Sequence, residues 1–396
     1  MQRQRPLGLT LLILLLSAVE SGGKTWQQEV ITDESLKVGV VLPTKGALAE
    51  TGSAIRDVLN AYFDSVNRDG VNNAHKIALR FADSTDDPAI TVANVRRLIQ
   101  EEEVFAIVSG ISAGADEEIA VLAQAAKVPL IGPATLLPSS GPTFNRYGFY
   151  LLPGLREQAQ ALVLFAARRS ERPNARIAII YAEGILTSAA ANAAELQTRR
   201  SGWRSIVKRA YQRQHFNAPE IVRSLKQEGV EFVLFFGAPS DDVAFVNEAT
   251  IAKWAPIFLL PGVLSSRELP GSAKIDFKEK IFLTFPTVPS DVSATGREEL
   301  LALRNKYKLA PRSISAQIHA LAAAKVFVEG LRLSGNVRDR EKLIASLESM
   351  RGYDTGLTPK ITFGPKNRIG AKGSYIVSVN TETGRFTSEA EWIPVD

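Results

Sequence analysis

Val104-Phe-Ala-Ile-Val108, followed directly by Ser109-Gly-Ile-Ser-Ala-Gly-Ala115, is the stretch that decides the fold. The first part is a short apolar run typical of a buried strand, and the second is a loop of small residues. Asp116–Lys127 then carries apolar residues at helical spacing. A strand, loop and helix in this order place free backbone N–H groups at the carboxyl edge of a sheet, where small polar or anionic groups bind. Alternatively, Gly110 and Gly114 merely permit a tight turn.

The same alternation extends outward in both directions. Upstream and downstream of this stretch, apolar strands at 36–42, 77–82 and 128–131 alternate with amphipathic helices. The pattern restarts with strands at 150–152, 176–181, 205–210, 232–236 and 257–260. Because each strand is apolar throughout, we predict an α/β fold with parallel sheets covered by helices on both faces, in two domains of the same type.

The last third of the chain no longer alternates regularly between strand and helix. A further strand at 280–284 leads into Phe285–Ser290, whose two prolines indicate a crossing segment. Helical patterns follow at 296–307, 314–333 and 339–349, and short antiparallel strands are predicted at 360–363, 374–379 and 384–387. The turn Asn380-Thr-Glu-Thr-Gly384 predicts a hairpin between the last two strands.

Composition excludes several classes of protein. The 396 residues, 45% hydrophobic and 22% charged, suit two or three globular domains. The net charge of +5 is small and its cations are scattered, which argues against nucleic-acid binding. The absence of cysteine excludes disulfides, thiolate metal sites, cysteine nucleophiles and a lipidated cysteine anchor.

The N-terminus has the pattern of a secretory signal peptide. Arg3 and Arg5 precede the apolar run Leu7–Val19, and small and polar residues follow at Glu20–Gly23. The thirteen apolar-run residues are too few for an ordinary membrane span. We therefore predict a signal peptide at 1–23 and export to a bacterial periplasm.

Sequence patterns of catalysis are missing. The three histidines, His75, His215 and His319, show no metal-ligand spacing, and His319 is expected to be a packed core residue. No nucleophile elbow, phosphate-binding loop or zinc motif occurs. We predict no catalytic residue, no metal and no cofactor, which disfavours a hydrolase or oxidoreductase on this scaffold.

Several segments together resemble a known family. Lys37–Pro43 with Thr44 and Gly46, the helix and turn Ala54–Gly70, Asp83–Pro88, Val104–Gly110 and Val128–Ala134 match its motifs in order and spacing. The chain resembles the type I periplasmic binding proteins, specifically the branched-chain amino acid (Leu/Ile/Val)-binding branch of ABC-transporter solute receptors. The resemblance covers roughly residues 36–390.

The resemblance implies two Rossmann-like lobes joined by a three-segment hinge. Lobe one would comprise 36–152 and 288–356, and lobe two 153–287 and 357–396. The three crossings would lie near Tyr150–Gly154, Thr284–Pro289 and Gly356–Lys360. The helices at 294–350 would return to lobe one.

The resemblance also implies a ligand site between the lobes. In lobe one the ligand carboxylate would be held by Ser112, Ala113 and Gly114 and by Ala134 and Thr135, with Thr51 flanking the side chain. The corresponding positions in lobe two are Glu183, Leu186, Ser240 and Gly262. Serine and threonine at such places are otherwise ordinary turn or cap residues.

Lobe two departs from the family pattern. Leu259-Leu-Pro-Gly-Val-Leu264 lacks the family's glutamate, and Phe236–Asp241 lacks the expected tyrosine. A buried ammonium without a carboxylate partner costs several kcal/mol. Either Glu183, Asp241 or Asp242 substitutes, or the ligand has no ammonium, as in a small organic or aromatic acid.

The function implied is solute capture without chemistry. The partners would be a small-molecule ligand and an inner-membrane ABC permease, with no nucleic acid, and the chain is expected to be a monomer. The alternative is a periplasmic sensor or regulator that uses the same fold.

Overall fold

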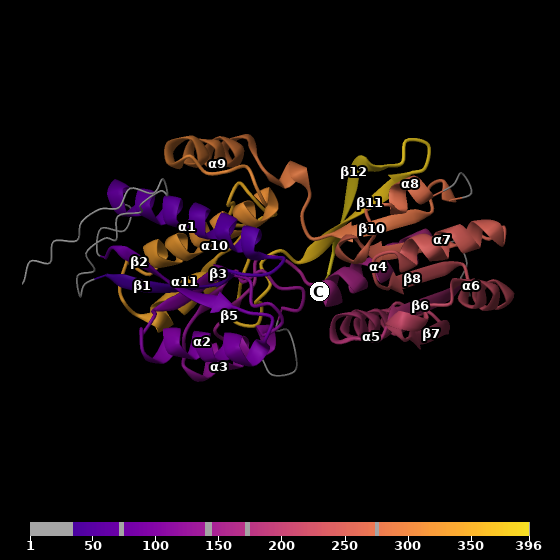
Figure 1. Cartoon of the computed structure of the whole chain (residues 1–396), viewed down its shortest axis with the longest axis horizontal. Helices are drawn as coiled ribbons and strands as arrows, with labels where there is room; N and C mark the ends of the chain where they lie inside the picture. The colour runs from indigo at the N-terminus through magenta and orange to yellow at the C-terminus, as the bar shows by residue number, and fades with distance from the viewer. Residues whose placement is uncertain (1–34, 71–74, 139–144, 171–174, 274–276, 396) are drawn as a thin grey trace, which may run out of the picture. The chain divides into compact units, whose positions relative to one another are not determined.

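The computed structural model describes residues 35–70, 75–138, 145–170, 175–273 and 277–395. The predicted signal peptide, 1–23, lies outside these residues. In the described ranges, no helix combines the length and apolar character needed to cross a membrane. The chain forms two sheets with helices packed on their faces, as predicted (Figure 1).

Lobe one is built on a five-stranded parallel sheet in the order β2-β1-β3-β4-β5. Its strands are β1 (Leu36–Pro43), β2 (Ile77–Ser84), β3 (Ala106–Gly110), β4 (Leu130–Ile131) and β5 (Gly148–Phe149). The helices α1 (Ala49–Asp69), α2 (Pro88–Gln100) and α3 (Asp116–Ala125) connect them. Val40 and Val108 fill a core on one face, and Val41 and Ile107 fill a second core on the other. This two-sided burial is why the strands are apolar throughout.

The predicted strand at 150–152 is displaced in the structure. The strand is β5, which ends at Phe149 and pairs with β4, so it closes lobe one instead of opening the second block. Tyr150 makes only an isolated bridge to Ile369. The run Tyr150–Leu152 had the pattern of a strand because Leu151 and Leu152 are apolar, but they are apolar because they pack in the lobe-one core and not because they pair in a sheet.

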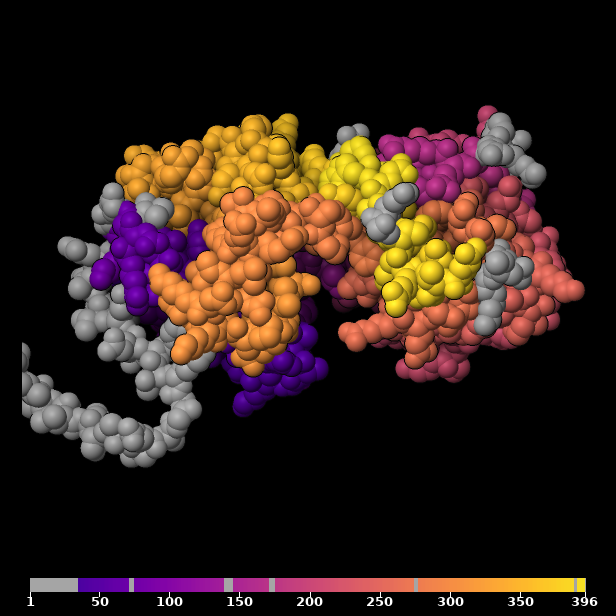
Figure 2. Space-filling model, turned by 90° about the horizontal axis from the view of Figure 1, so that it is seen from above, coloured from indigo at the N-terminus to yellow at the C-terminus, as the bar shows by residue number. Residues whose placement is uncertain are grey.

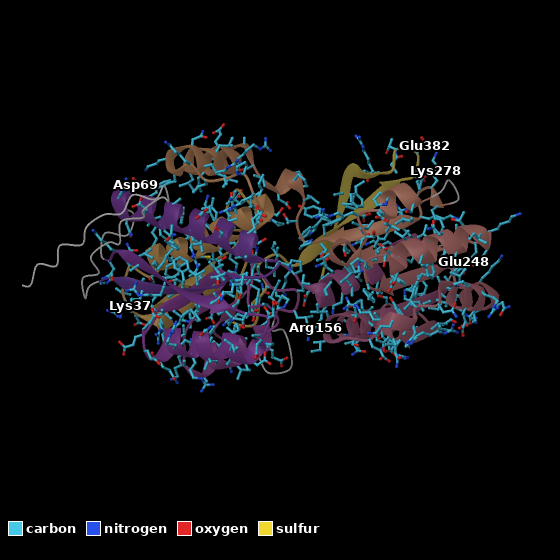
Figure 3. The ribbon with its side chains drawn as sticks, viewed as in Figure 1. Lys37, Asp69, Arg156, Glu248, Lys278 and Glu382 are labelled. Atoms are coloured by element: carbon cyan, nitrogen blue, oxygen red, sulfur yellow. The ribbon has the colours of Figure 1, made fainter. Side chains whose placement is uncertain are left out.

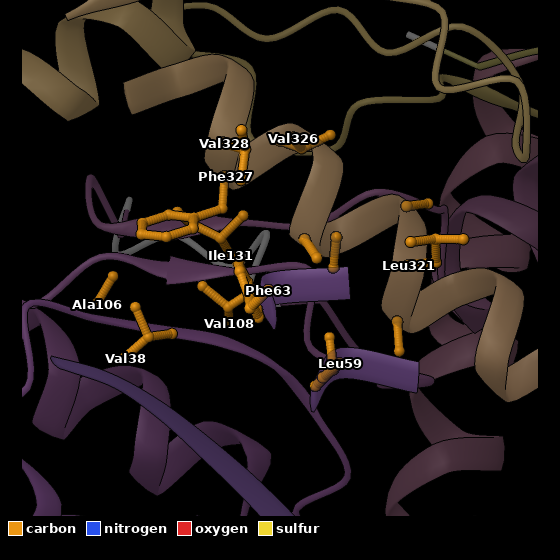
Figure 4. Close-up of a cluster of buried hydrophobic side chains, with 14 of the residues drawn as sticks. Val38, Leu59, Phe63, Ala106, Val108, Ile131, Leu321, Val326, Phe327 and Val328 are labelled. Atoms are coloured by element: carbon orange, nitrogen blue, oxygen red, sulfur yellow. The ribbon is translucent and has the colours of Figure 1, made fainter. Parts of the chain in front are cut away.

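Three helices from the C-terminal part of the chain complete lobe one. They are α9 (Ala294–Tyr307), α10 (Ile314–Leu333) and α11 (Arg340–Ser349). Phe327 of α10 packs edge-to-face on Phe63 of α1, with ring centroids 6.2 Å apart, close to Val108 and Ile131 of the sheet (Figure 4). In the space-filling view the orange residues near 300 lie beside the indigo N-terminal helix (Figure 2).

Lobe two is built on a seven-stranded sheet in the order β12-β11-β10-β9-β8-β6-β7. Its strands are β6 (Arg176–Ala182), β7 (Ser205–Tyr211), β8 (Phe232–Phe236), β9 (Ile257–Pro261), β10 (Ile281–Phe285), β11 (Gly373–Asn380) and β12 (Arg385–Pro394). The helices are α4 (Leu155–Arg169), α5 (Ile185–Arg200), α6 (Ala218–Gln227), α7 (Asp241–Ile251) and the short α8 (Leu269–Ser272). Strands β6 to β10 are parallel, whereas β11 and β12 are antiparallel.

The hairpin prediction at the end of the chain is confirmed. Asn380 accepts hydrogen bonds from the N–H groups of Glu382 and Thr383 at 3.0 and 2.9 Å, and Gly384 has a φ of 62°. Lys278 forms an ion pair with Glu382 at 3.2 Å, and the two side chains lie together beside this turn (Figure 3). The turn residues therefore fix the register of β11 and β12.

The third connection between the lobes lies later in the chain than the expected Gly356–Lys360. Leu357, Ile361 and Phe363 are buried in the lobe-one core. The ring of Phe363 packs 5.2 Å from that of Phe149. Residues 357 to about 370 therefore belong to lobe one, and 360–363 is not a lobe-two strand. The apolar alternation at 361 and 363 predicts burial but does not say against which core.

The loop after β4 joins the two lobes. Ala134 donates its N–H to the carbonyl of Gly110 in lobe one at 2.9 Å. Two residues later, the carbonyl of Leu136 accepts from the N–H of Leu155 in α4 at 2.8 Å, and Leu136 packs on the lobe-two core. Arg156, labelled in Figure 3, donates to the carbonyl of Pro138 at 3.3 Å.

Candidate functional site

The loop between β3 and α3 forms the lobe-one half of the site. Ser109 and Ala113 have φ values of 60° and 50°, and Gly110 and Gly114 have φ values of 109° and 100°. A Cβ on Gly110 would lie 2.4 Å from the carbonyl oxygen of Val41, so a side chain does not fit there. Repeated left-handed residues turn backbone N–H groups outward, a geometry that suits anions.

This loop is rich in unused hydrogen-bond donors. The hydroxyls of Ser109 and Ser112 are buried and have no hydrogen-bond partner among the described residues. The backbone N–H groups of Ser112, Ala113 and Gly114 likewise find no acceptor in the described chain. Leaving a buried hydroxyl unsatisfied costs about 1–3 kcal/mol, so an oxygen of a ligand would gain by binding here.

The two hydroxyls line a small pocket. Its interior is about 20 Å³, enough for one water-sized group, and its wall includes Pro133, Tyr150 and Asp116. Asp116 begins α3, whose first turn also carries Glu117 and Glu118. These negative charges cancel the positive potential at the N-terminus of α3. The attraction for a ligand oxygen therefore comes from the loop hydroxyls and N–H groups and not from the helix end.

Two other lobe-one candidates have partners of their own. The N–H of Ala134 is occupied by Gly110, so Ala134 cannot offer that group to a ligand. The hydroxyl oxygen of Thr135 accepts from the N–H of Leu137 at 3.1 Å, which leaves its proton available for donation. Of this pair, only Thr135 keeps a donor for the site.

Thr51 lies in the first turn of α1, where its hydroxyl is 3.2 Å from that of Ser313. Ser313 precedes α10 with a left-handed φ of 44°. Next to it, Arg312 donates to Ser53 at 2.7 Å and to Asp57 at 3.2 Å. The sequence did not single out Ser313, because it comes some 260 residues after Thr51 and no local pattern joins them.

His319 lies within α10, close to the site loop. Its Nε2 is 3.1 Å from the carbonyl of Gly132, two residues before Ala134. Burial lowers the pKa of this imidazole below its ordinary value. The neutral imidazole of His319 therefore contacts the loop after β4. The sequence predicted only that His319 packs in the core, and did not predict this contact.

The lobe-two candidates lie at the carboxyl edge of the second sheet. Glu183 follows β6 with an exposed side chain, and Leu186 is in the first turn of α5. Ser240 precedes α7 with a φ of 87° and makes no side-chain cap bond. Gly262 follows β9, and a Cβ there would lie 2.2 Å from the Phe285 ring. The structure thus places these four residues on neighbouring loops of one edge.

The two aspartates considered as substitutes for the missing glutamate are both engaged within lobe two. Asp241 accepts a hydrogen bond from Tyr211 at 2.7 Å. Asp242 is fully buried and accepts from the hydroxyl of Ser265 at 3.1 Å and the N–H of Ser266 at 2.7 Å. Burial raises the pKa of Asp242 above its usual range. Asp242 is therefore an internal linker of two loops and not a ligand group.

The edge carries exposed aliphatic side chains instead. Ile185 is 83% exposed, Val263 50% and Leu186 39%. The sequence did not predict Val263 as a site residue. Its position directly after Gly262, at the end of a predicted strand, could have indicated that it lies at this edge. Across the described residues, no cluster of acidic or histidine side chains suited to a metal ion is found.

The comparisons with known proteins agree with this geometry. The model of the periplasmic binding protein family matches residues 35–385. The chain therefore belongs to the periplasmic binding protein family, as its motifs predicted. It is 23% identical over 332 residues to a Leu/Ile/Val-binding protein homolog 7 of Brucella abortus (strain 2308), covering 81% of each chain.

Solved structures show the same fold. A branched-chain amino acid ABC transporter protein from Thermus thermophilus with bound valine is similar with a TM-score of 0.67 and 17% identity, over 90% of this chain and 97% of that one. A fatty acid ABC transporter substrate-binding protein from Thermomonospora curvata is similar with a TM-score of 0.66 and 18% identity, over 92% of this chain and 96% of that one. The type I periplasmic binding protein fold is thus confirmed, and these relatives are binding proteins, not enzymes.

Proposed function

We propose that the chain is the solute receptor of an ABC importer. It captures a small polar, organic-acid or amino-acid-like ligand between its lobes and delivers it to an inner-membrane permease. The observation that carries the proposal is the donor-rich loop Ser109–Gly114 at the carboxyl edge of lobe one. Its two hydroxyls and the N–H groups of Ser112, Ala113 and Gly114 lack partners among the described residues.

The three connections between the lobes supply the hinge. They lie near Leu151–Gly154, at Pro286–Val288 and near Ala371–Lys372. Closure around a ligand excludes water and strengthens each hydrogen bond made there. The closed state gains population only by the difference between its affinity for the ligand and that of the open state. Residues 1–23 direct export, and the receptor acts in the periplasm as a monomer.

Ligand binding is tested by a thermal-shift screen of the full chain. The panel contains amino acids, small aliphatic and aromatic carboxylates, amides and urea-like compounds. A ligand at a hundred times its dissociation constant adds about 2.7 kcal/mol to the free energy of unfolding, which such a screen detects. Ser112→Ala should weaken every hit, whereas Ser349→Ala, whose serine ends α11 and bonds only to a carbonyl in its own turn, should not.

Two results would contradict the proposal. One is a panel in which no compound raises the unfolding temperature. The other is a hit that Ser112→Ala leaves unchanged. Delivery to a permease is tested separately, by stimulation of ATP hydrolysis in reconstituted transporter, and location by fractionation of cells that express the full chain.

A further inference from the structure

The carboxyl edge of the lobe-two sheet carries exposed apolar side chains beside the polar Glu183 and Ser240. Ile185 and Leu186 follow β6, Val263 follows β9, and Ala238 and Pro239 follow β8, which lies between those two strands. The exposed fractions of Ile185 and Val263, 83% and 50%, are high for aliphatic side chains. Burying such surface against a hydrocarbon is favourable, whereas leaving it in water is not.

This surface offers little to an ammonium group. The carboxylates of Asp241 and Asp242 are held by Tyr211 and by the Ser265–Ser266 turn. Glu183 is exposed to water, and an ion pair with so exposed a carboxylate adds little binding free energy. An amine carried into this edge would lose its hydration without a buried counter-charge.

Lobe one offers the opposite chemistry. The two free hydroxyls and three free N–H groups of Ser109–Gly114 are all donors, which suits a carboxylate. Asp116 lines the same pocket, and its negative charge repels an acidic ligand, a doubly charged one more strongly than a singly charged one. The loop therefore favours a ligand with one carboxylate over one with two, and the pocket has room for a single oxygen of it.

We propose that the ligand is an aliphatic monocarboxylate without an α-amine. The acid binds the Ser109–Gly114 loop, and the hydrocarbon chain covers Ile185, Leu186 and Val263. This inference rests on the proposed receptor function and specifies its ligand class. Each methylene buried on this surface should raise the affinity about fourfold.

The test is calorimetric titration of the full chain with straight-chain monocarboxylates of two to eight carbons. The expected result is an affinity that rises about fourfold per methylene until the surface is covered. Ile185→Gln should weaken octanoate about fivefold and leave acetate unchanged. Ile251→Gln is the matched control, because Ile251 is 75% exposed at the opposite end of α7 and should leave the whole series unchanged.

A second pair of ligands isolates the amine. Leucine and 4-methylpentanoate share one carbon skeleton and differ by the amino group, and 4-methylpentanoate should bind at least tenfold more tightly. An affinity that does not depend on chain length, equal effects of the two isoleucine variants, or leucine binding as tightly as 4-methylpentanoate would each overturn the inference. In those three cases binding has been measured, so the receptor function stands. If no acid of the series binds, the inference fails, and the wider panel decides the receptor function.

Discussion

Replacing Ser109 by alanine should stabilise the ligand-free protein and weaken the liganded one. Ser109 is 2% exposed, and its hydroxyl has no partner in the described part of the chain. An unsatisfied buried hydroxyl costs about 1–3 kcal/mol. Removing the hydroxyl should therefore raise the free energy of unfolding. We expect about 1 kcal/mol, the lower end of this range, because the neighbouring pocket has room for a water that partly satisfies the hydroxyl.

The same substitution removes a donor from the proposed carboxylate site. A hydrogen bond to a charged group contributes about 1.5–3 kcal/mol, so the dissociation constant should rise about 10- to 150-fold. Urea unfolding followed by circular dichroism measures the first effect. Calorimetry with the best ligand from the thermal-shift screen measures the second.

Ser265→Ala is the matched control in lobe two. Its hydroxyl donates to the carboxylate of the fully buried Asp242 at 3.1 Å. Removing this donor should lower the free energy of unfolding by about 1.5–3 kcal/mol. The two serine variants should therefore shift stability in opposite directions. A Ser109→Ala variant that is destabilised by 1 kcal/mol or more while ligand affinity is unchanged would refute the reasoning, because the hydroxyl would then have a structural role.

Three further outcomes are expected. Leucine, isoleucine and valine should bind weakly, because the buried carboxylate of Asp242 is already held by the Ser265–Ser266 turn and is not offered to an ammonium, and a micromolar dissociation constant for any of them in calorimetry would contradict this. Gly262→Ala should lower the midpoint of thermal unfolding by several degrees, because its Cβ would lie 2.2 Å from the Phe285 ring, and an unchanged midpoint would show that the ring moves freely. Hydrogen bonds from Lys208 and Arg199 lower the pKa of the Glu195 carboxyl below its ordinary value of 4.5. The stabilisation from these bonds is therefore present above pH 4.5 and is lost as the pH falls through the lowered pKa. Glu195→Gln should therefore cost up to about 1 kcal/mol at pH 7 and progressively less toward pH 3, and a cost in urea unfolding that does not depend on pH would contradict the pairing.

The alternation of strand and helix could be predicted because it is local. The apolar runs that became β1, β3, β6 and β8 are buried on both faces, which removes polar positions from their sequence. The hairpin at Asn380–Gly384 was also predictable, since its turn bonds join residues two and three apart. Such features need no knowledge of the rest of the fold.

The features that the sequence did not predict depend on contacts between distant segments of the chain. Ile361 and Phe363 have the spacing of a strand, but only the packing of Phe363 against Phe149 shows that they belong to lobe one. Asp242 was a candidate ligand group until its bonds to the Ser265–Ser266 turn were visible. In both cases the sequence shows the chemistry of the residue and not its partner.

The loop after β4 has a mechanical consequence. Ala134 is tied to lobe one through Gly110, and Leu136 is tied to lobe two through Leu155, so Thr135 is the single residue between two anchors. A rotation of one lobe against the other must therefore twist the backbone within Ala134–Leu136 or break one of the two bonds. If both bonds hold, closure of the proposed receptor would be taken up within these three residues and would reorient the Thr135 hydroxyl, so the ligand donor of this loop would be coupled to the angle between the lobes.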